Sequence, residues 1–75
     1  MELTIDKLLN AVEQIYDVTF EEMLHPENNQ AVHARLHAIC ALDSQLKLDY
    51  SEIADIFDTS TNIVDKIIRN KRSYF

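Results

Sequence analysis

The chain has 75 residues, of which 47% are hydrophobic, and its formal net charge is −6. This length suits a single domain near the lower limit at which one core is stable without a metal or disulfide, and the apolar fraction excludes a disordered chain. The one cysteine excludes an internal disulfide and is typical of a reducing compartment. No apolar run approaches the ~18 residues of a membrane span, and no secretory signal opens the chain. We therefore expect a soluble, cytoplasmic protein without a membrane partner.

Two helices are predicted before Pro26. Residues 4–17 place their apolar side chains on one helical face, with Thr4 as the N-cap. These side chains are Ile5, Leu8, Leu9, Val12, Ile15 and Tyr16. A shorter helix begins at Thr19, which can form a capping box with Glu22, and ends before the proline. We expect it to pack against the first helix through Phe20, Met23 and Leu24.

A third helix is predicted over residues 30–46, after a loop with the composition of a turn. Its apolar stripe consists of Val32, Leu36, Ile39, Cys40 and Leu46. Much of the remaining surface is also small or apolar, namely Ala31, Ala34, Ala38, Ala41 and Leu42. A helix that is apolar around most of its girth is contacted on several sides. We expect it to be the central helix of an all-α bundle of four to five helices.

Residues 49–72 have the pattern of a helix-turn-helix, in which two helices meet across a turn of about three residues. The inward-facing residues are Ile53, Ala54 and Phe57 in the first helix and Val64, Ile67 and Ile68 in the second. The chain has no glycine, so Asp58 or Thr59 must adopt the positive φ that this turn requires. Asp49, with Glu52, is the predicted cap of the first helix, and Ser60 or Thr61 caps the second.

Charge is unevenly distributed along the chain. Residues 1–58 contain 12 acidic and three basic residues (net −9), whereas residues 59–75 contain one acidic and four basic residues (net +3). The four basic residues are Lys66, Arg69, Lys71 and Arg72. Since salt screens carboxylates that lie more than ~10 Å away, such a patch can bind DNA phosphates although the whole protein is acidic.

The order of these elements resembles the C-terminal DNA-binding domain of the bacterial replication initiator DnaA, within the Trp-repressor-like group of folds. The resemblance runs from residue 3 to residue 72 and rests mainly on predicted core positions. They are Ala11-Val12 with Tyr16, Val18, Met23-Leu24, Ala41-Leu42, Glu52-Ile53, Phe57 and Val64. The resemblance implies an all-α fold over residues 1–75 in which the second helix of the helix-turn-helix enters a DNA groove.

The DNA-contacting segments of that family differ from this chain. The family has an Arg- and Lys-rich loop between its second and third helices, whereas residues 25–30 contain neither residue. After the motif's Phe the family has Gly-Gly-Arg-Asp-His-Ser/Thr-Thr-Val; here residues 58–64 are one residue shorter and lack the Arg, Asp and His that read bases. The resemblance therefore implies the fold and the groove-entering helix, but not the family's sequence specificity. The shorter turn is more similar to the helix-turn-helix of phage and transcriptional regulators.

Residues at and just after the N-terminus of a groove-docked helix face the base edges. Here they are Ser60, Thr61 and Asn62, with Lys66 one turn further on. Asn62 can bond an adenine bidentately, and Thr61 can contact a thymine methyl or a phosphate. The predicted phosphate contacts are Lys66, Arg69, Lys71 and Arg72. The alternative is that Ser60 and Thr61 are only helix caps and that the basic residues form a solvated helix end.

His33, His37 and Cys40 share one helix face at spacings that suit zinc ligands. A structural site lacks its fourth ligand unless His25 or Glu27 folds back, and the metalloprotease pattern lacks its glutamate. We therefore favour packed or solvated histidines and a cysteine that behaves as a small hydrophobe, and we expect no metal or other cofactor. The chain has neither a catalytic arrangement nor a glycine-rich phosphate loop, so we do not expect an enzyme.

Two functions from different classes are consistent with these patterns. The first is a helix-turn-helix protein that binds double-stranded DNA, as a transcription or replication regulator of phage or mobile-element type. A module this small is expected to bind as a homodimer. The second is an acidic protein-interaction module that keeps the fold and regulates a replication or transcription protein. The net charge of −9 over residues 1–58 and the loop without Arg or Lys favour the second.

Overall fold

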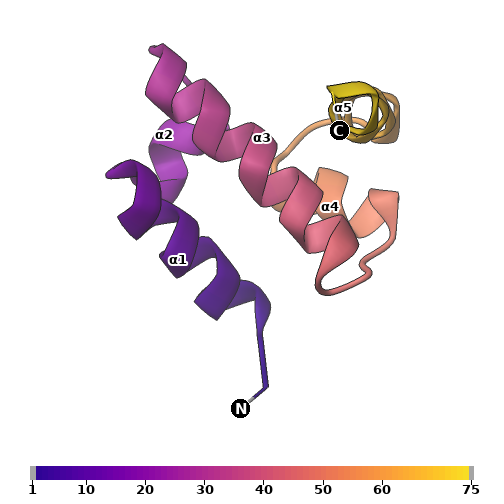
Figure 1. Cartoon of the computed structure of the whole chain (residues 1–75), viewed down its shortest axis with the longest axis horizontal. Coiled ribbons are helices and arrows are strands. Elements are labelled where there is room, and N and C mark those ends of the chain that lie inside the picture. The colour runs from indigo at the N-terminus through magenta and orange to yellow at the C-terminus, as the bar shows by residue number, and fades with distance from the viewer. Residues whose placement is uncertain (1, 75) are drawn as a thin grey trace.

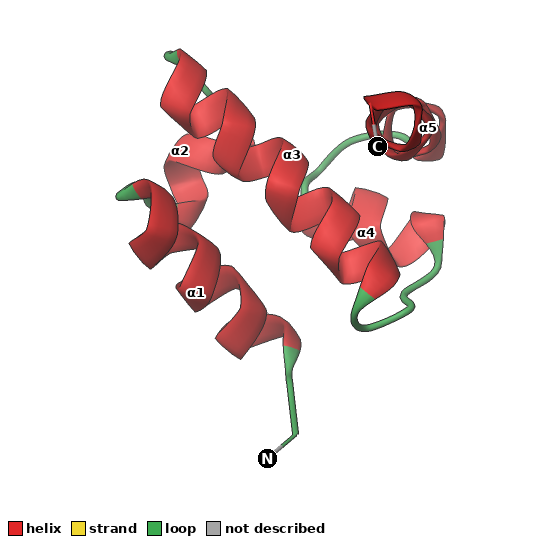
Figure 2. Ribbon diagram, viewed as in Figure 1, coloured by secondary structure: helices red, strands yellow, loops and turns green. Residues whose placement is uncertain are grey.

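The computed structural model describes the backbone of residues 2–74 and the side chains of residues 2–70. The described residues form helices and loops and no strand (Figure 2). The five helices are α1 (Ile5–Tyr16), α2 (Phe20–Leu24), α3 (Asn29–Ser44), α4 (Tyr50–Ile56) and α5 (Thr61–Tyr74). The predicted all-α class is confirmed, and each predicted helix is present with ends that differ by one or two residues.

The central helix of the bundle is α3 (Figure 1). It packs against each of the other four helices, with α1 and α2 on one side of it and α4 and α5 on the other. The predicted central position of this segment is confirmed. The buried surface of α3 is rich in small side chains, which let the neighbouring backbones approach closely; it consists of Ala31, Ala34, Ala38, Ile39, Cys40, Ala41 and Leu42.

Two side chains predicted to lie in the core are exposed instead. Ile15 on α1 is 68% exposed, and Val32 on α3 is 37% exposed. The fully buried part of α1 is limited to Leu8 and Val12, while Ile5, Leu9 and Tyr16 are partly buried against the core. The predicted packing of α2 against α1 is correct only in part: α2 packs chiefly against α3, and it is joined to α1 by the hydrogen bond that the Phe20 N–H donates to Glu13 Oε2 at 2.8 Å.

The caps of the first two helices agree with the sequence, and the cap of α4 differs. The Thr4 hydroxyl accepts a hydrogen bond from the backbone N–H of Lys7 at 3.2 Å, and Thr19 forms the predicted capping box with Glu22. Asp49 occupies the N-cap position of α4, but its side chain makes no capping hydrogen bond. The capping box predicted for α4 is therefore wrong, and the backbone alone begins that helix.

One arginine links α2, α3 and the end of α4. Arg35 Nη1 donates to the backbone oxygens of Met23 at 3.2 Å and Leu24 at 3.0 Å. Those carbonyls belong to the last turn of α2, where no later turn of helix can satisfy them. The guanidinium also lies 5.7 Å from the centroid of the Phe57 ring, whose own neighbour is the ring of Phe20 at 5.5 Å. The arginine thus fixes α2 relative to the carboxyl end of α4.

The turn between α4 and α5 uses an aspartate where such turns often have glycine. Asp58 has φ 52°, as predicted, and the N–H of Thr59 donates to the Ala54 carbonyl at 2.9 Å. Asp tolerates this left-handed conformation better than most residues, and a β-branched residue tolerates it poorly.

We predict that Asp58→Val lowers the free energy of unfolding by about 1–2 kcal/mol, because valine must adopt the same positive φ. Asp58→Gly is the matched control and is expected to change stability by less than about 0.5 kcal/mol. Urea denaturation followed by circular dichroism measures both values. Equal effects of the two substitutions would show that the Asp58 side chain, not the backbone conformation, matters at this position.

Candidate functional site

Helices α4 and α5 form a packed pair joined by residues 57–60. The predicted inward stripe of this pair is confirmed: Ile53, Ala54, Phe57, Val64 and Ile68 are buried, and Ile67 is half-buried against the core. Ala54 is 3% exposed, which fits a small residue where two helices approach. Because α5 packs on both α3 and α4, its inner face is fixed and its opposite face is left to solvent.

The N-terminus of α5 exposes its first polar side chains. Ser60 Oγ accepts from the backbone N–H of Ile63 at 3.3 Å, so Ser60 acts as the predicted cap of this helix. Thr61 and Asn62, in the first turn, are exposed. The structure thus separates the three residues predicted to face the bases: Ser60 has a structural role, whereas Thr61 and Asn62 are accessible to a ligand.

The positive charge on the exposed face of α5 is lower than its number of basic residues indicates, because one of them is paired with a carboxylate. Lys66 and Arg69 are exposed, but Arg69 Nε lies 3.0 Å from Oδ1 of Asp65, one turn earlier on the helix. This ion pair neutralises part of the charge of Arg69 toward an approaching anion. Lys71 and Arg72 fall within the bounds of α5, and their side chains lie outside the described residues.

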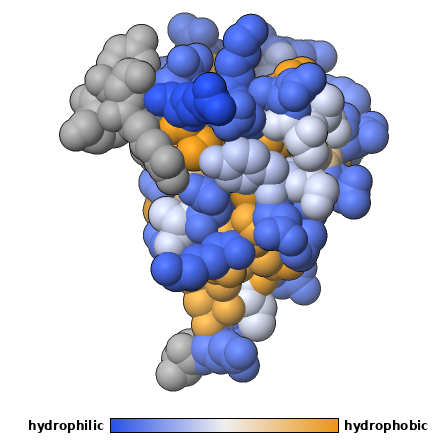
Figure 3. Space-filling model, turned by 90° about the vertical axis from the view of Figure 1, so that its right-hand side faces the viewer, coloured by the Kyte–Doolittle hydropathy of each residue, from blue (hydrophilic) through white to orange (hydrophobic). Residues whose placement is uncertain are grey.

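A depression in the surface brings several of these side chains together. It is lined by Asn62, Ile63, Asp65, Lys66, Arg69 and Asn70. Ile63 and Asn70 were not predicted as site residues. The sequence did contain a signal for Ile63, because it is an apolar residue that lies at the edge of the inward-facing stripe of α5 rather than within it. On the side of the molecule where α4 and α5 lie, hydrophilic residues predominate and hydrophobic areas are interspersed among them (Figure 3).

A second depression lies at the junction of α2 and α3. It includes part of the loop that is rich in Arg and Lys in the initiator domain that this chain resembles. Its lining is Thr19, Glu21, Glu22, His25, Glu27 and Asn28. Asn28 is also the N-cap of α3, because its Oδ1 accepts from the N–H of Ala31 at 2.8 Å. Three carboxylates in this lining make the junction acidic, so it is unsuited to the phosphate contacts of the family's loop.

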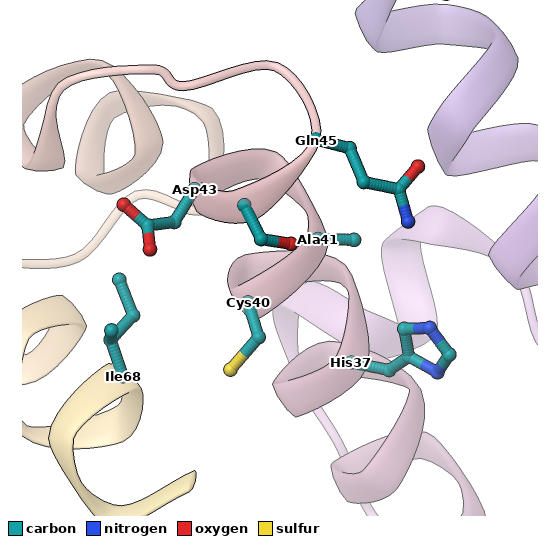
Figure 4. A pocket seen from close by; sticks show the side chains of 7 residues that line it. His37, Cys40, Ala41, Asp43, Gln45 and Ile68 are labelled. Atoms are coloured by element: carbon teal, nitrogen blue, oxygen red, sulfur yellow. The ribbon is translucent and has the colours of Figure 1, made fainter. Parts of the chain in front are cut away.

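The residues considered as zinc ligands do not form one site. His37 Nδ1 lies 3.0 Å from the Tyr16 hydroxyl, and His33 is exposed. Figure 4 shows the His37 ring pointing away from the Cys40 thiol, which is directed toward the side of α3 where Ile68 of α5 lies. Among the described residues, no three His, Cys, Asp or Glu side chains are grouped closely enough to hold a metal ion.

Comparison of the chain with protein-family models, curated proteins and solved structures found no match. The resemblance to the initiator domain therefore stays a prediction. Over the residues that the structure describes, none of the helices has both the length and the apolar character needed to cross a membrane.

Proposed function

We propose that this chain is a helix-turn-helix protein that binds double-stranded DNA and regulates transcription or replication, with α4 and α5 as the motif. The observation that carries the proposal is the two-sided character of α5. Its inner face is buried through Val64 and Ile68, and its first turn and outer face expose Thr61, Asn62 and Lys66. A helix fixed in this way can enter the major groove with its N-terminal residues against the bases.

The exposed residues divide into two roles. Asn62 is placed to bond an adenine and Thr61 to contact a thymine methyl or a phosphate, while Lys66 and Arg69 contact phosphates and set the position of the helix. Lys71 and Arg72 extend the same basic sequence. Since Arg69 is paired with Asp65 and the chain as a whole carries a net charge of −6, affinity for DNA is modest, and binding as a homodimer is part of the proposal.

Binding to random-sequence duplex DNA at several salt concentrations tests the proposal. The wild type is expected to bind weakly, with an affinity that falls as salt rises. Lys66→Ala should reduce the slope of the salt dependence by about one released counterion, and Arg69→Ala should reduce it by less, because Asp65 already offsets that charge. Lys7→Ala, which removes an exposed lysine from α1, is the control and should leave the slope unchanged. Undetectable binding at low salt would contradict the proposal.

The second candidate is an acidic module that binds a basic protein, such as an initiator or a polymerase subunit. The depression lined by Glu21, Glu22 and Glu27 favours it, since an acidic concave surface complements a basic partner. The Asp65–Arg69 pair favours it too, because a surface selected for phosphate binding gains nothing from that carboxylate. Salt-dependent binding to a basic partner, together with no binding to DNA, would decide for this function.

A further inference from the structure

Ile63 is a large apolar residue that α5 presents to solvent. It is 46% exposed, although its neighbour Val64 is fully buried in the same turn. Resting on the DNA-binding function proposed above, we propose that Ile63 determines sequence preference by contacting the 5-methyl group of thymine in the major groove. That methyl group is the apolar feature by which the major groove distinguishes thymine from other bases.

The residues around Ile63 fit an A·T base pair. Asn62 and Asn70 line the same depression as Ile63, and a side-chain amide can bond the N6 and N7 atoms of adenine bidentately. Asn70 lies seven residues after Ile63 and four after Lys66, so the three share one helical face. An Asn amide next to Ile63 can therefore contact the adenine of an A·T base pair while Ile63 contacts the thymine. Lys66 then reaches a neighbouring phosphate.

The competing explanation is that Ile63 contacts a second copy of the chain rather than DNA. Stable protein interfaces bury roughly 800 Å² on each partner. Among the described side chains of α5, Ile63 is the one large apolar residue that is exposed. The other exposed large apolar residues of the described side chains are Leu3, which precedes α1, Ile15 on α1 and Val32 on α3. One isoleucine among amides and charges is too small a patch for such an interface, but it matches the size of a methyl contact.

The test compares two duplexes: alternating adenine and thymine between G·C ends, and the same duplex with uracil in place of thymine. Uracil keeps the hydrogen-bonding pattern and removes only the methyl group. The wild type is expected to bind the uracil duplex about threefold to tenfold more weakly, and Ile63→Ala should bind both duplexes alike. Ile15→Ala, which removes an exposed isoleucine from α1, is the matched control and should retain the wild-type ratio.

The outcomes separate this inference from the function on which it rests. A wild type that binds both duplexes equally, or an Ile63→Ala variant that keeps the preference for thymine, overturns the role of Ile63 while DNA binding stands. Absence of binding to either duplex at low salt overturns the proposed function, and the inference falls with it. A change of oligomeric state in Ile63→Ala, measured by sedimentation, would assign the residue to a protein interface instead.

Discussion

Replacement of Phe57 by alanine is expected to lower the free energy of unfolding by about 3–5 kcal/mol. The Phe57 side chain is 1% exposed, contacts the Phe20 ring and lies under the Arg35 guanidinium. Truncation leaves a cavity where α2, α3 and α4 meet, and it removes the aromatic partner of a half-buried cation. For a chain of this length, total stability is on the order of 4–11 kcal/mol, so this single substitution is expected to remove a large fraction of it.

Urea denaturation followed by circular dichroism measures this loss. If Phe57→Ala does not fold, Phe57→Leu provides the measurement, with an expected loss of about 1–2 kcal/mol. Ile15→Ala is the control, because Ile15 is 68% exposed and its truncation should change stability by less than about 0.5 kcal/mol. A loss at Ile15 as large as that at Phe57 would mean that the outer face of α1 is covered in solution.

Features that depend on a few neighbouring residues were predicted well from the sequence. The Thr4 cap, the Thr19–Glu22 capping box and the positive φ of Asp58 each follow from residues at most three positions apart. The inward stripe of α4 and α5 also followed from spacing, because the short connection leaves the two helices only one way to bury their apolar faces. Local chemistry was not sufficient everywhere, since Asp49 starts α4 without the capping bond that its position favours.

Features that depend on where α3 crosses its neighbours were not predicted. The helical period gives Ile15 and Val12 equal weight, yet Ile15 is exposed and Val12 is buried, because only the contact with α3 distinguishes them. The bonds of Arg35 to the last carbonyls of α2 join residues 11 and 12 positions apart, and no sequence spacing indicates them. For the candidate site, spacing indicated which residues α5 carries and that Ser60 or Thr61 caps it, but the exposure of Ile63 and the ion pair of Arg69 with Asp65 required the structure.

The second large effect is expected from reversing the charge on the outer face of α5. Lys66→Glu combined with Arg69→Glu should weaken binding to duplex DNA about a hundredfold or more at low salt, because like charges placed together cost several kcal/mol and each 1.4 kcal/mol is tenfold in affinity. Both side chains are exposed, so the helix content measured by circular dichroism should not change. Equal binding by the variant and the wild type would show that DNA contacts another surface.

Removing a negative charge from the same face of α5 should have the opposite effect on DNA binding. Asp65→Asn removes the carboxylate that lies 3.0 Å from Arg69 Nε, and an exposed pair of this kind is worth at most about 1 kcal/mol. DNA affinity should therefore rise about threefold to fivefold, with a steeper salt dependence because Arg69 then acts fully on phosphate. If the chain instead binds a basic protein through the depression lined by Glu21, Glu22 and Glu27, on the other side of α3 from α5, neither variant should weaken binding to that protein. Filter binding with DNA and titration with a basic protein thus distinguish the two functions by which ligand responds to the substitutions.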